Sequence, residues 1–167
     1  MTASPARRAF VVRLNPGDPP QDALPEGMQT NELILGWSEA QGLLNPKLTW
    51  ETFRQIVKET YNLSTRQAGG QAGSLWIFLR EMKKGDLVVV PYGDQFYLAE
   101  VEGGACYIPQ KVAEGRAYRR PVRWLNNYQP FRRKGISPGL AKALKPQQTC
   151  TCCDVQLPEI EKLARDS

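Results

Sequence analysis

The sequence has no histidine and no long apolar run, and each absence excludes a class of function. Without histidine the chain cannot form a Ser-His-Asp triad, a Cys-His dyad or an imidazole-ligated metal site. No apolar stretch approaches the roughly 18 residues that a membrane helix needs. The N-terminal segment carries two arginines but lacks the apolar region of a secretory signal. We therefore expect a cytoplasmic protein that does not enter a membrane.

Cysteine is also scarce, with four residues at Cys106, Cys150, Cys152 and Cys153. Three of them fall in TCTCC near the C-terminus, a spacing that differs from a C-x-x-C metal pair. We expect reduced thiols of a cytosolic protein, and keep a soft-metal or redox role as the alternative. The sequence predicts no metal site and no cofactor.

The overall composition is that of one globular domain, and the charged residues are unevenly distributed along the chain. The chain has 167 residues, of which 41% are apolar and 23% charged, and its net charge is +5. Between Lys111 and Lys145 we count ten basic residues and one acid, Glu114, so this segment carries +9 and the rest of the chain −4. Such asymmetry is typical of a face that meets a polyanion, although a solvated basic surface would show it too.

Hydrophobic patterns predict alternating strands and short helices. We expect strands at 8–14, 31–37, 86–92, 95–101, 105–109 and 117–125. We expect helices after the capping residues Thr49, Ser74 and Ser137, and a last one at 158–166. Proline and glycine predict loops at 15–27 and 64–74, and Gly93-Asp94 predicts a two-residue hairpin turn.

These elements predict an α+β domain. Tight turns make the successive middle strands antiparallel, so we expect a small curved antiparallel β-barrel with short helices inserted between strands and a C-terminal helix. Pro121 suggests that its strand lies at an edge or a bulge. We expect a single domain over 8–149 and a helical extension over 150–167.

The segment GDLVVVP, 85–91, belongs to a pattern that resembles a known family. The pattern continues from Gly36-Trp37-Ser38 through the helix of Trp76 to Arg123-x-Leu125. It resembles the N-terminal domains of bacterial Mrr-type restriction endonucleases and, more widely, the PUA superfamily with its EVE, YTH, ASCH and SRA members. The resemblance implies a curved barrel that receives a flipped, methylated base of double-stranded DNA, in a prokaryotic defence protein longer than this chain. A fused or partner nuclease and an oligomer are further possibilities.

The resemblance directs attention to polar and aromatic residues that could form a base pocket. Trp37 would be a wall of an aromatic cage, with Ser38 as a hydrogen-bond partner of the base. Asn31 would contact a base edge. The alternatives are a buried core tryptophan at Trp37 and an ordinary strand start at Asn31.

Two further elements are candidates for the same pocket. Trp76, in the first turn of its expected helix, would face the pocket. Tyr92, Gly93 and Asp94 would form its rim, with Asp94 accepting from an exocyclic amine. Ordinary core packing of Trp76 and plain turn chemistry are the alternatives.

A second set of residues would hold the DNA backbone. Arginine suits phosphate because its guanidinium can bind two oxygens at once. The candidates are Arg119, Arg120, Arg123, Arg132, Arg133 and Lys134. If all six neutralised phosphates, log K would fall with log salt at a slope of about −5.

We expect a non-catalytic domain. The Mrr-type nucleases cut with a carboxylate cluster and a lysine, and the only E-x-K here, Glu81-Met82-Lys83, falls at a predicted helix end. There is no P-loop and no nucleophile elbow. A PUA-like RNA-binding domain and an SH3-like protein-interaction module remain as alternatives to the DNA reader.

Overall fold

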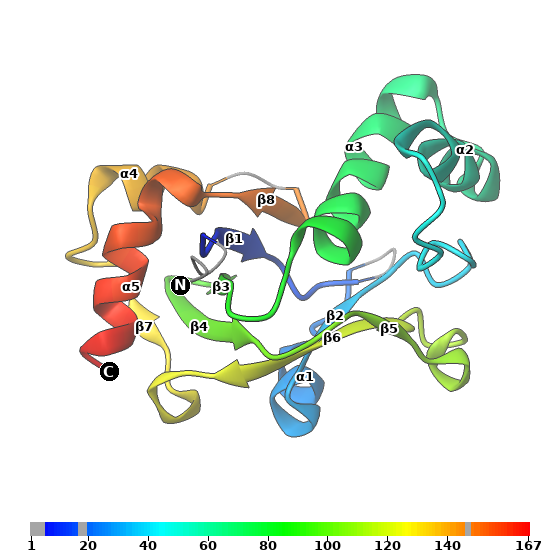
Figure 1. Cartoon of the computed structure of the whole chain (residues 1–167). Coiled ribbons are helices and arrows are strands. Elements are labelled where there is room, and N and C mark those ends of the chain that lie inside the picture. The colour runs from blue at the N-terminus through cyan, green and yellow to red at the C-terminus, as the bar shows by residue number, and fades with distance from the viewer. Residues whose placement is uncertain (1–5, 17–19, 146–147) are drawn as a thin grey trace, which may run out of the picture.

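A strongly curled sheet forms the centre of the molecule, and short helices pack around it (Figure 1). The computed structural model describes residues 6–16, 20–145 and 148–167. The curled sheet has the shape of a half-barrel, so the expected α+β class and curvature are confirmed.

The described residues form the following elements. The strands are β1 (Ala9–Val12), β2 (Glu32–Leu35), β3 (Leu87–Tyr92), β4 (Gln95–Val101), β5 (Cys106–Tyr107), β6 (Tyr118–Trp124), β7 (Phe131–Arg132) and β8 (Cys150–Cys152). The helices are α1 (Leu24–Thr30), α2 (Trp50–Tyr61), α3 (Thr65–Trp76), α4 (Pro138–Ala143) and α5 (Leu157–Arg165). Short 3-10 or π segments are η1 (Ile77–Glu81), η2 (Pro109–Lys111), η3 (Asn126–Tyr128) and η4 (Asp154–Gln156).

The strand order is β2-β6-β4-β3-β1-β8, with β5 beside β6 and β7 beside β4. The hairpin β3–β4 turns at Gly93-Asp94 as predicted, because Tyr92 pairs with Gln95. The expected all-antiparallel sheet is wrong at one place, since β1 and β3 pair in parallel. A parallel pair needs a long crossover, and here the segment from α1 to η1 supplies it.

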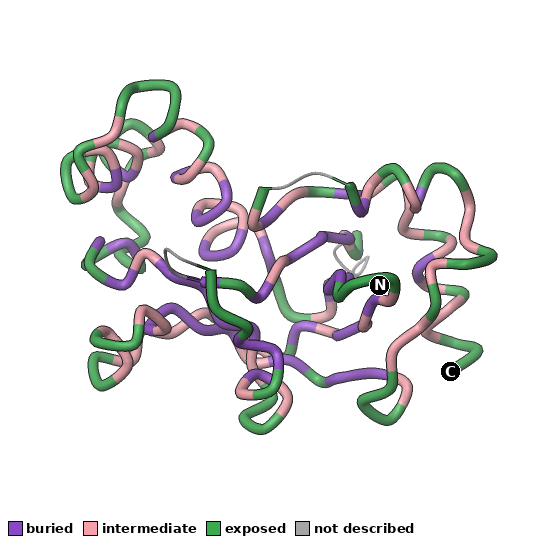
Figure 2. Tube along the Cα trace, turned by 180° about the vertical axis from the view of Figure 1, so that it is seen from behind, coloured by how far each residue is buried: buried purple, intermediate pink, exposed green. Residues whose placement is uncertain are grey.

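The sheet is buried on both faces, which explains the unbroken apolar run of β3. Val88 and Val90 point into one core, together with side chains of α2 and α3, whereas Leu87 and Val89 point into a second core with α4 and α5. Figure 2 shows the buried positions along these strands, and Figure 1 shows the two helix pairs on different sides of the sheet. The period of two along a strand sends neighbouring residues to the two cores.

Two helix boundaries follow the predicted capping residues. The side chain of Thr49 accepts a hydrogen bond from the backbone of Thr52 at the start of α2. Ser137 does the same for Leu140 at the start of α4. The predicted C-terminal helix is present as α5.

The predicted loop at 64–74 is wrong, because these residues form most of α3. Ser64 and Gln67 form a capping box, in which each side chain bonds the backbone of the other residue. Each glycine in this helix costs about 1 kcal/mol relative to alanine. The capping box and the burial of Ala68, Ala72 and Leu75 offset that cost.

Ser74, predicted to cap a helix, instead lies buried inside α3. Its hydroxyl accepts a hydrogen bond from the backbone nitrogen of Cys150 at 3.3 Å. The hydroxyl therefore ties α3 to β8, and the helix that begins before Ser74 continues into η1.

Two other expectations need correction. The predicted loop at 15–27 ends earlier, because Pro25 sits in the first turn of α1; residues 17–19 of that loop lie outside the described residues. Pro121 does not lie on an edge strand, since β6 pairs with β2 on one side and with β5 and β4 on the other. Pro121 comes just before Val122, where the pairing of β6 with β4 begins.

The C-terminal residues complete the sheet. β8, formed by the cysteine-rich stretch, pairs antiparallel with β1, and Ile160 of α5 is buried in the second core. Within the described part of the chain, no helix combines the length and the apolar character needed to cross a membrane.

Candidate functional site

A cavity of about 710 Å³ opens beside Trp37, where the end of β2 meets α2 and α3. This volume lies within the roughly 300–1,000 Å³ typical of small-ligand sites. Its lining combines aromatic, apolar and polar side chains, among them Trp37, Leu35, Tyr61, Gln71, Glu39 and Arg13. We call it the Trp37 cavity.

Trp37 is held in this cavity by an unusual backbone and by a side-chain hydrogen bond. Its φ is 58°, in the left-handed region that a bulky residue rarely adopts. The indole nitrogen donates to the side-chain oxygen of Gln71 on α3 at 2.8 Å. Strained backbone of this kind persists only where surrounding structure enforces it, and it gathers at functional sites.

Tyr61, at the end of α2, forms a second aromatic wall. Its hydroxyl donates to Glu39 at 2.6 Å. Burial, together with the negative charge of Glu39, raises the pKa of Tyr61 far above its usual value. The hydroxyl, protonated at neutral pH as in any ordinary tyrosine, holds Glu39 at the edge of the cavity through this hydrogen bond.

Ser38 does not take the expected place beside Trp37. It is fully buried, and its hydroxyl accepts a hydrogen bond from the backbone nitrogen of Ala117 at 2.9 Å. Its carbonyl accepts from the hydroxyl of Tyr107 at 2.7 Å. These bonds anchor the chain that precedes β6, and Ser38 is absent from the lining of the Trp37 cavity.

Trp76 also lies outside the Trp37 cavity. Its ring meets those of Trp50 and Phe53 edge to face, at 5.5 Å and 5.1 Å between centroids. The guanidinium of Arg80 stacks on its ring at 4.8 Å. Trp76 ends α3 instead of starting a helix, so it faces a cluster formed with α2.

The turn at 92–94 borders a second, smaller cavity of about 330 Å³. Tyr92 and Gly93 line it together with Arg13, and the hydroxyl of Tyr92 donates to Asp22 at 2.6 Å. Asp94 is exposed beside this cavity, and its carbonyl accepts a hydrogen bond from the backbone nitrogen of Arg133 at 3.2 Å. We call this the Tyr92 cavity.

Asn31 lies apart from both cavities. It adopts a left-handed φ of 56° at the end of α1, where its backbone nitrogen bonds Gly27. Its side-chain oxygen accepts from the hydroxyl of Tyr128 at 2.6 Å. The structure gives Asn31 a role in ending a helix, as asparagine often does.

Two of the predicted backbone-binding arginines are buried. Arg119 is 1% exposed and forms ion pairs with Glu26 and Glu32. Arg120 is 3% exposed, and its guanidinium donates to the carbonyls of Phe78 and Gly103. Neither side chain can reach a phosphate at the surface, so their placement on a DNA-binding face is wrong.

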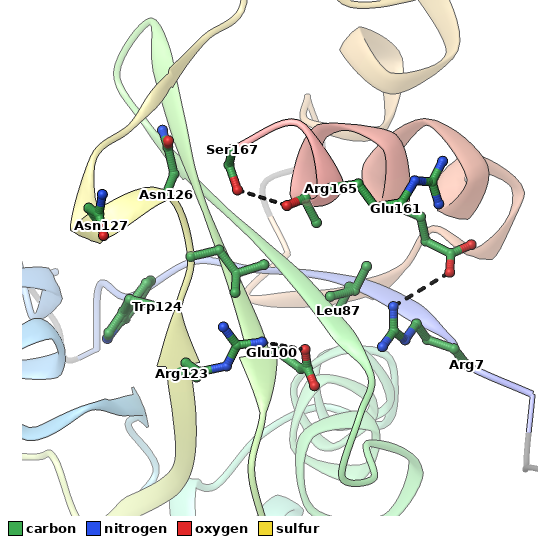
Figure 3. A pocket seen from close by; sticks show the side chains of 12 residues that line it. Arg7, Leu87, Glu100, Arg123, Trp124, Asn126, Asn127, Glu161, Arg165 and Ser167 are labelled. Atoms are coloured by element: carbon green, nitrogen blue, oxygen red, sulfur yellow. Dashed lines mark hydrogen bonds and ion pairs between the residues drawn. The ribbon is translucent and has the colours of Figure 1, made fainter.

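Arg123 is exposed but neutralised. It pairs with Glu100 at 3.0 Å and with Glu102 at 3.5 Å. Figure 3 shows it in a third cavity, of about 460 Å³, where Arg7 points toward Glu161 on the opposite side. Glu100 and Glu161 thus neutralise two of the cations that line the third cavity, which makes it less suited to a polyanion.

Arg132, Arg133 and Lys134 lie on and just after β7, beside the turn at 92–94. β7 pairs with the start of β4, which places Arg132 opposite Gln95. Arg13, just after β1, lines both the Trp37 and the Tyr92 cavity. Burial and the positive charge of Arg133 lower the pKa of Arg13. We call these four residues the basic rim. Within the part of the chain that the structure describes, Arg132, Arg133 and Lys134 form no ion pair with a carboxylate.

The cysteines are all free, with Cys150 and Cys153 buried and Cys152 exposed. Burial raises the pKa of Cys153 to about 12 and that of Cys150 well above its usual value. Arg8 donates to the sulfur of Cys152 at 3.1 Å, and the thiol donates to Asp154. The expectation of reduced thiols fits this arrangement, which makes the cysteine-rich stretch a strand of the sheet.

The E-x-K triplet falls at the end of η1, as predicted. Glu81 forms an ion pair with Arg8 at 3.0 Å. In residues 6–16, 20–145 and 148–167, no three histidine, cysteine or acidic side chains come together as a metal-binding group would require.

Of these residues lining the Trp37 cavity, the sequence predicted Trp37 as a site residue but not Tyr61, Gln71 or Arg13. Tyr61 was visible only as an apolar position of a helix. The spacing Ser64-x-x-Gln67 is a capping-box pattern and could have placed Gln71 on a helix. Arg13 carried no signal of its own.

Comparison with known proteins gives a family without an established activity. No curated protein and no solved structure matches the chain. The sequence model of a domain of unknown function, DUF8426, matches residues 15–141, which include Trp37, Tyr61, Gln71 and most of the basic rim. The match covers more than half of the chain, and the protein therefore belongs to the DUF8426 family.

Proposed function

We propose that this domain binds DNA and takes one base, swung out of the duplex, into the Trp37 cavity. The observation that carries the proposal is the fixed indole of Trp37, held by a left-handed backbone and by Gln71 inside a cavity. Arg13, which lines this cavity, would hold the backbone of the same strand together with the rest of the basic rim beside the turn at 92–94.

The free energy needed to extrude a base and the free energy returned by stacking it on an aromatic side chain are of similar size. Extruding a base from a duplex costs a few kcal/mol. Stacking on an aromatic side chain returns about 1–3 kcal/mol per base. Trp37 supplies a stacking face, and the amide nitrogen of Gln71 and the carboxylate of Glu39 are polar groups that could read the base edge.

A methylated base suits this cavity better than an unmodified one. Ile34 and Leu35 contribute apolar lining beside Trp37. A methyl group against apolar lining would bury additional area, worth about 0.8 kcal/mol for one carbon. The role that we propose is non-catalytic: a PUA-like targeting domain of a prokaryotic restriction system, as the sequence resemblance implies.

The test is binding measured by fluorescence polarisation at two salt concentrations. The panel contains matched DNA duplexes with an unmodified site, 5-methylcytosine, 5-hydroxymethylcytosine or 6-methyladenine, together with one RNA duplex. We expect one modified DNA duplex to bind most tightly, and Trp37→Ala to abolish that preference while leaving weak, salt-dependent binding.

Trp76→Phe is the matched control, because Trp76 is an aromatic residue outside the Trp37 cavity. It should keep the preference for the modified duplex. Equal loss in both variants, or equal binding of all duplexes, would overturn the base-reading role. Preference for RNA would favour the RNA-binding alternative, and no binding at low salt would favour the protein-interaction module.

A further inference from the structure

β2 is a terminal strand of the sheet and has a neighbouring strand on one side only, β6 (Figure 1). The carbonyl of Asn31 accepts a hydrogen bond from the backbone nitrogen of Val122 at 2.9 Å, and β2 continues in the same register. In an antiparallel pair, every second residue bonds the partner strand and the residues between them turn their N–H and C=O groups away from it. Leu33 and Leu35 therefore face β6 with these groups, whereas the N–H and C=O of Ile34 point to the outer edge of the sheet.

Other outward positions of the sheet edges are covered by helices. Gly27 of α1 packs against the carbonyl of Glu32, where a Cβ would lie only 2.6 Å from the oxygen. In β8, at the other end of the sheet, the backbone nitrogen of Cys150 donates to Ser74 of α3 at 3.3 Å. The outer edge of Ile34 differs, because no described residue forms a hydrogen bond with its N–H or C=O on that side.

The segment that follows β1 lines the same cavity as Ile34 but does not pair with β2. The carbonyls of Leu14 and Pro16 accept hydrogen bonds from the backbone nitrogens of Ala23 and Gln21, each at 2.9 Å. Ile34 itself is fully buried and lines the Trp37 cavity. Buried backbone groups are nearly always hydrogen-bonded in folded proteins, so a partner for this donor and acceptor must come from outside the chain.

Polar side chains of the Trp37 cavity are already engaged with its aromatic walls. The oxygen of the Gln71 amide accepts from the indole of Trp37, and Glu39 accepts from the hydroxyl of Tyr61. These bonds hold the walls in place before a ligand enters. The main chain of Ile34 is the part of this lining that presents both a donor and an acceptor without a partner on the cavity side.

A donor and an acceptor held side by side match the Watson–Crick edge of a nucleic-acid base. In cytosine the exocyclic amine donates, and the ring nitrogen next to it accepts. The complementary base occupies this edge in a duplex, and the edge becomes available when the base is extruded. Because both groups of one strand residue point in the same direction, they can bond a single base at the same time.

We propose that the N–H and C=O of Ile34, on the open edge of β2, read the Watson–Crick edge of the base that enters the Trp37 cavity. The inference rests on the proposed function and deepens it, because it narrows the class of modified base. A substituent on carbon 5 of cytosine leaves the Watson–Crick edge unchanged, whereas a methyl group on the exocyclic amine of adenine occupies part of it. The site is therefore suited to 5-methylcytosine and 5-hydroxymethylcytosine.

The first experiment titrates the full chain with 5-methyl-2′-deoxycytidine and two neutral analogues, followed by NMR. The 3-deaza analogue replaces the accepting ring nitrogen by C–H, and the N4,N4-dimethyl analogue lacks the donor N–H groups. We expect the parent nucleoside to shift the indole N–H of Trp37 and to move the amide of Ile34 downfield. The amides of Leu33 and Leu35, which bond β6, should move less. Each analogue should bind about tenfold more weakly or worse, because a buried polar group then stays without its partner.

Two variants of one residue test the main chain directly. Ile34→Pro removes the N–H that faces the cavity but no bond to β6, and proline is tolerated at such positions of an edge strand. Ile34→Val also shortens the side chain but keeps the N–H, and it is the matched control. We expect Ile34→Pro to bind the parent nucleoside and its 3-deaza analogue alike, and Ile34→Val to keep the wild-type difference. The dispersion of each amide spectrum reports whether the variant is folded, and if Ile34→Pro is not, the analogues on the wild type decide.

The outcomes separate the two proposals. If the parent nucleoside shifts the Trp37 indole but both analogues bind as tightly, the main-chain reading is wrong and the base-binding function stands. An Ile34 amide that stays in place while the indole shifts would overturn the reading too. If none of the three nucleosides shifts the Trp37 indole, the proposed function itself fails.

Discussion

Gln71 fixes Trp37 across the boundary between α3 and the end of β2, with 2.8 Å between the indole nitrogen and the amide oxygen. The bond connects a helix that begins with a capping box to a residue with a left-handed backbone. The position of the indole therefore depends on a helix far along the chain, and the proposed base site depends on both.

Replacing Gln71 by leucine should release the indole without emptying the cavity. One net hydrogen bond contributes about 1 kcal/mol, so we expect base affinity to fall roughly tenfold or less, and stability to fall by a similar free energy. The indole N–H signal of Trp37 should shift and broaden. Gln55→Leu on α2 removes an exposed amide hydrogen bond and is the control. An unchanged Trp37 signal in the Gln71 variant would contradict the role given to this bond.

Much of the fold could be predicted from local pattern. The hairpin at Gly93, the caps at Thr49 and Ser137 and the curled α+β sheet all follow from neighbouring residues. The parallel pairing of β1 with β3 could not, because it depends on a long crossover. Composition alone was misleading at 64–74, where glycine and alanine indicate a loop but the capping box and apolar burial stabilise a helix.

The candidate site was predictable only in part, because it too depends on contacts between residues that lie far apart in the sequence. Trp37 stands out as an aromatic residue at a strand end. Arg119 and Arg120 look like surface cations in the sequence, yet the carboxylates that neutralise Arg119 lie 93 and 87 positions away. Charge counted along a segment cannot show such pairing, and of the six cations predicted to hold DNA only Arg132, Arg133 and Lys134 stay in the basic rim.

Arg120→Met should test whether this arginine is structural. The substitution leaves the carbonyls of Phe78 and Gly103 without their buried donor, and each lost partner costs about 1–3 kcal/mol. We expect the free energy of unfolding, measured with urea, to fall by roughly 3 kcal/mol. Arg123→Gln, which breaks only exposed ion pairs, should cost less than about 1 kcal/mol. Similar small losses in both variants would be inconsistent with the buried role.

For the basic rim we predict little effect on stability and a clear effect on DNA binding. Arg132→Gln combined with Lys134→Gln removes two exposed cations, so stability should change by less than about 0.5 kcal/mol. The slope of log K against log salt should become shallower by about 1.4 to 1.8 if both contact phosphates. The measurement is DNA affinity over a series of salt concentrations. Lys83→Gln with Lys84→Gln, in the loop after η1, should leave the slope unchanged; an equal effect there would place the DNA elsewhere.

Glu26 makes the stability depend on pH. Burial acts to raise its pKa, but hydrogen bonds from Arg119 and Arg116 outweigh burial, and the pKa is lowered. A carboxyl with a lower pKa in the folded state contributes stability above its unfolded pKa of about 4.3, and that contribution is lost as pH falls through the folded value.

Glu26→Gln should therefore be less stable than the wild type at pH 7, and the difference should shrink on acidification below about pH 4.3. Part of the neutral-pH loss arises because buried Arg119 loses one of its two carboxylate partners. Urea unfolding midpoints between pH 7 and pH 3 provide the measurement, and Glu51→Gln, at the exposed start of α2, provides the control. A difference between Glu26→Gln and the wild type that stays constant over this range would show that the ion pairs of Glu26 do not control the acid sensitivity of the fold.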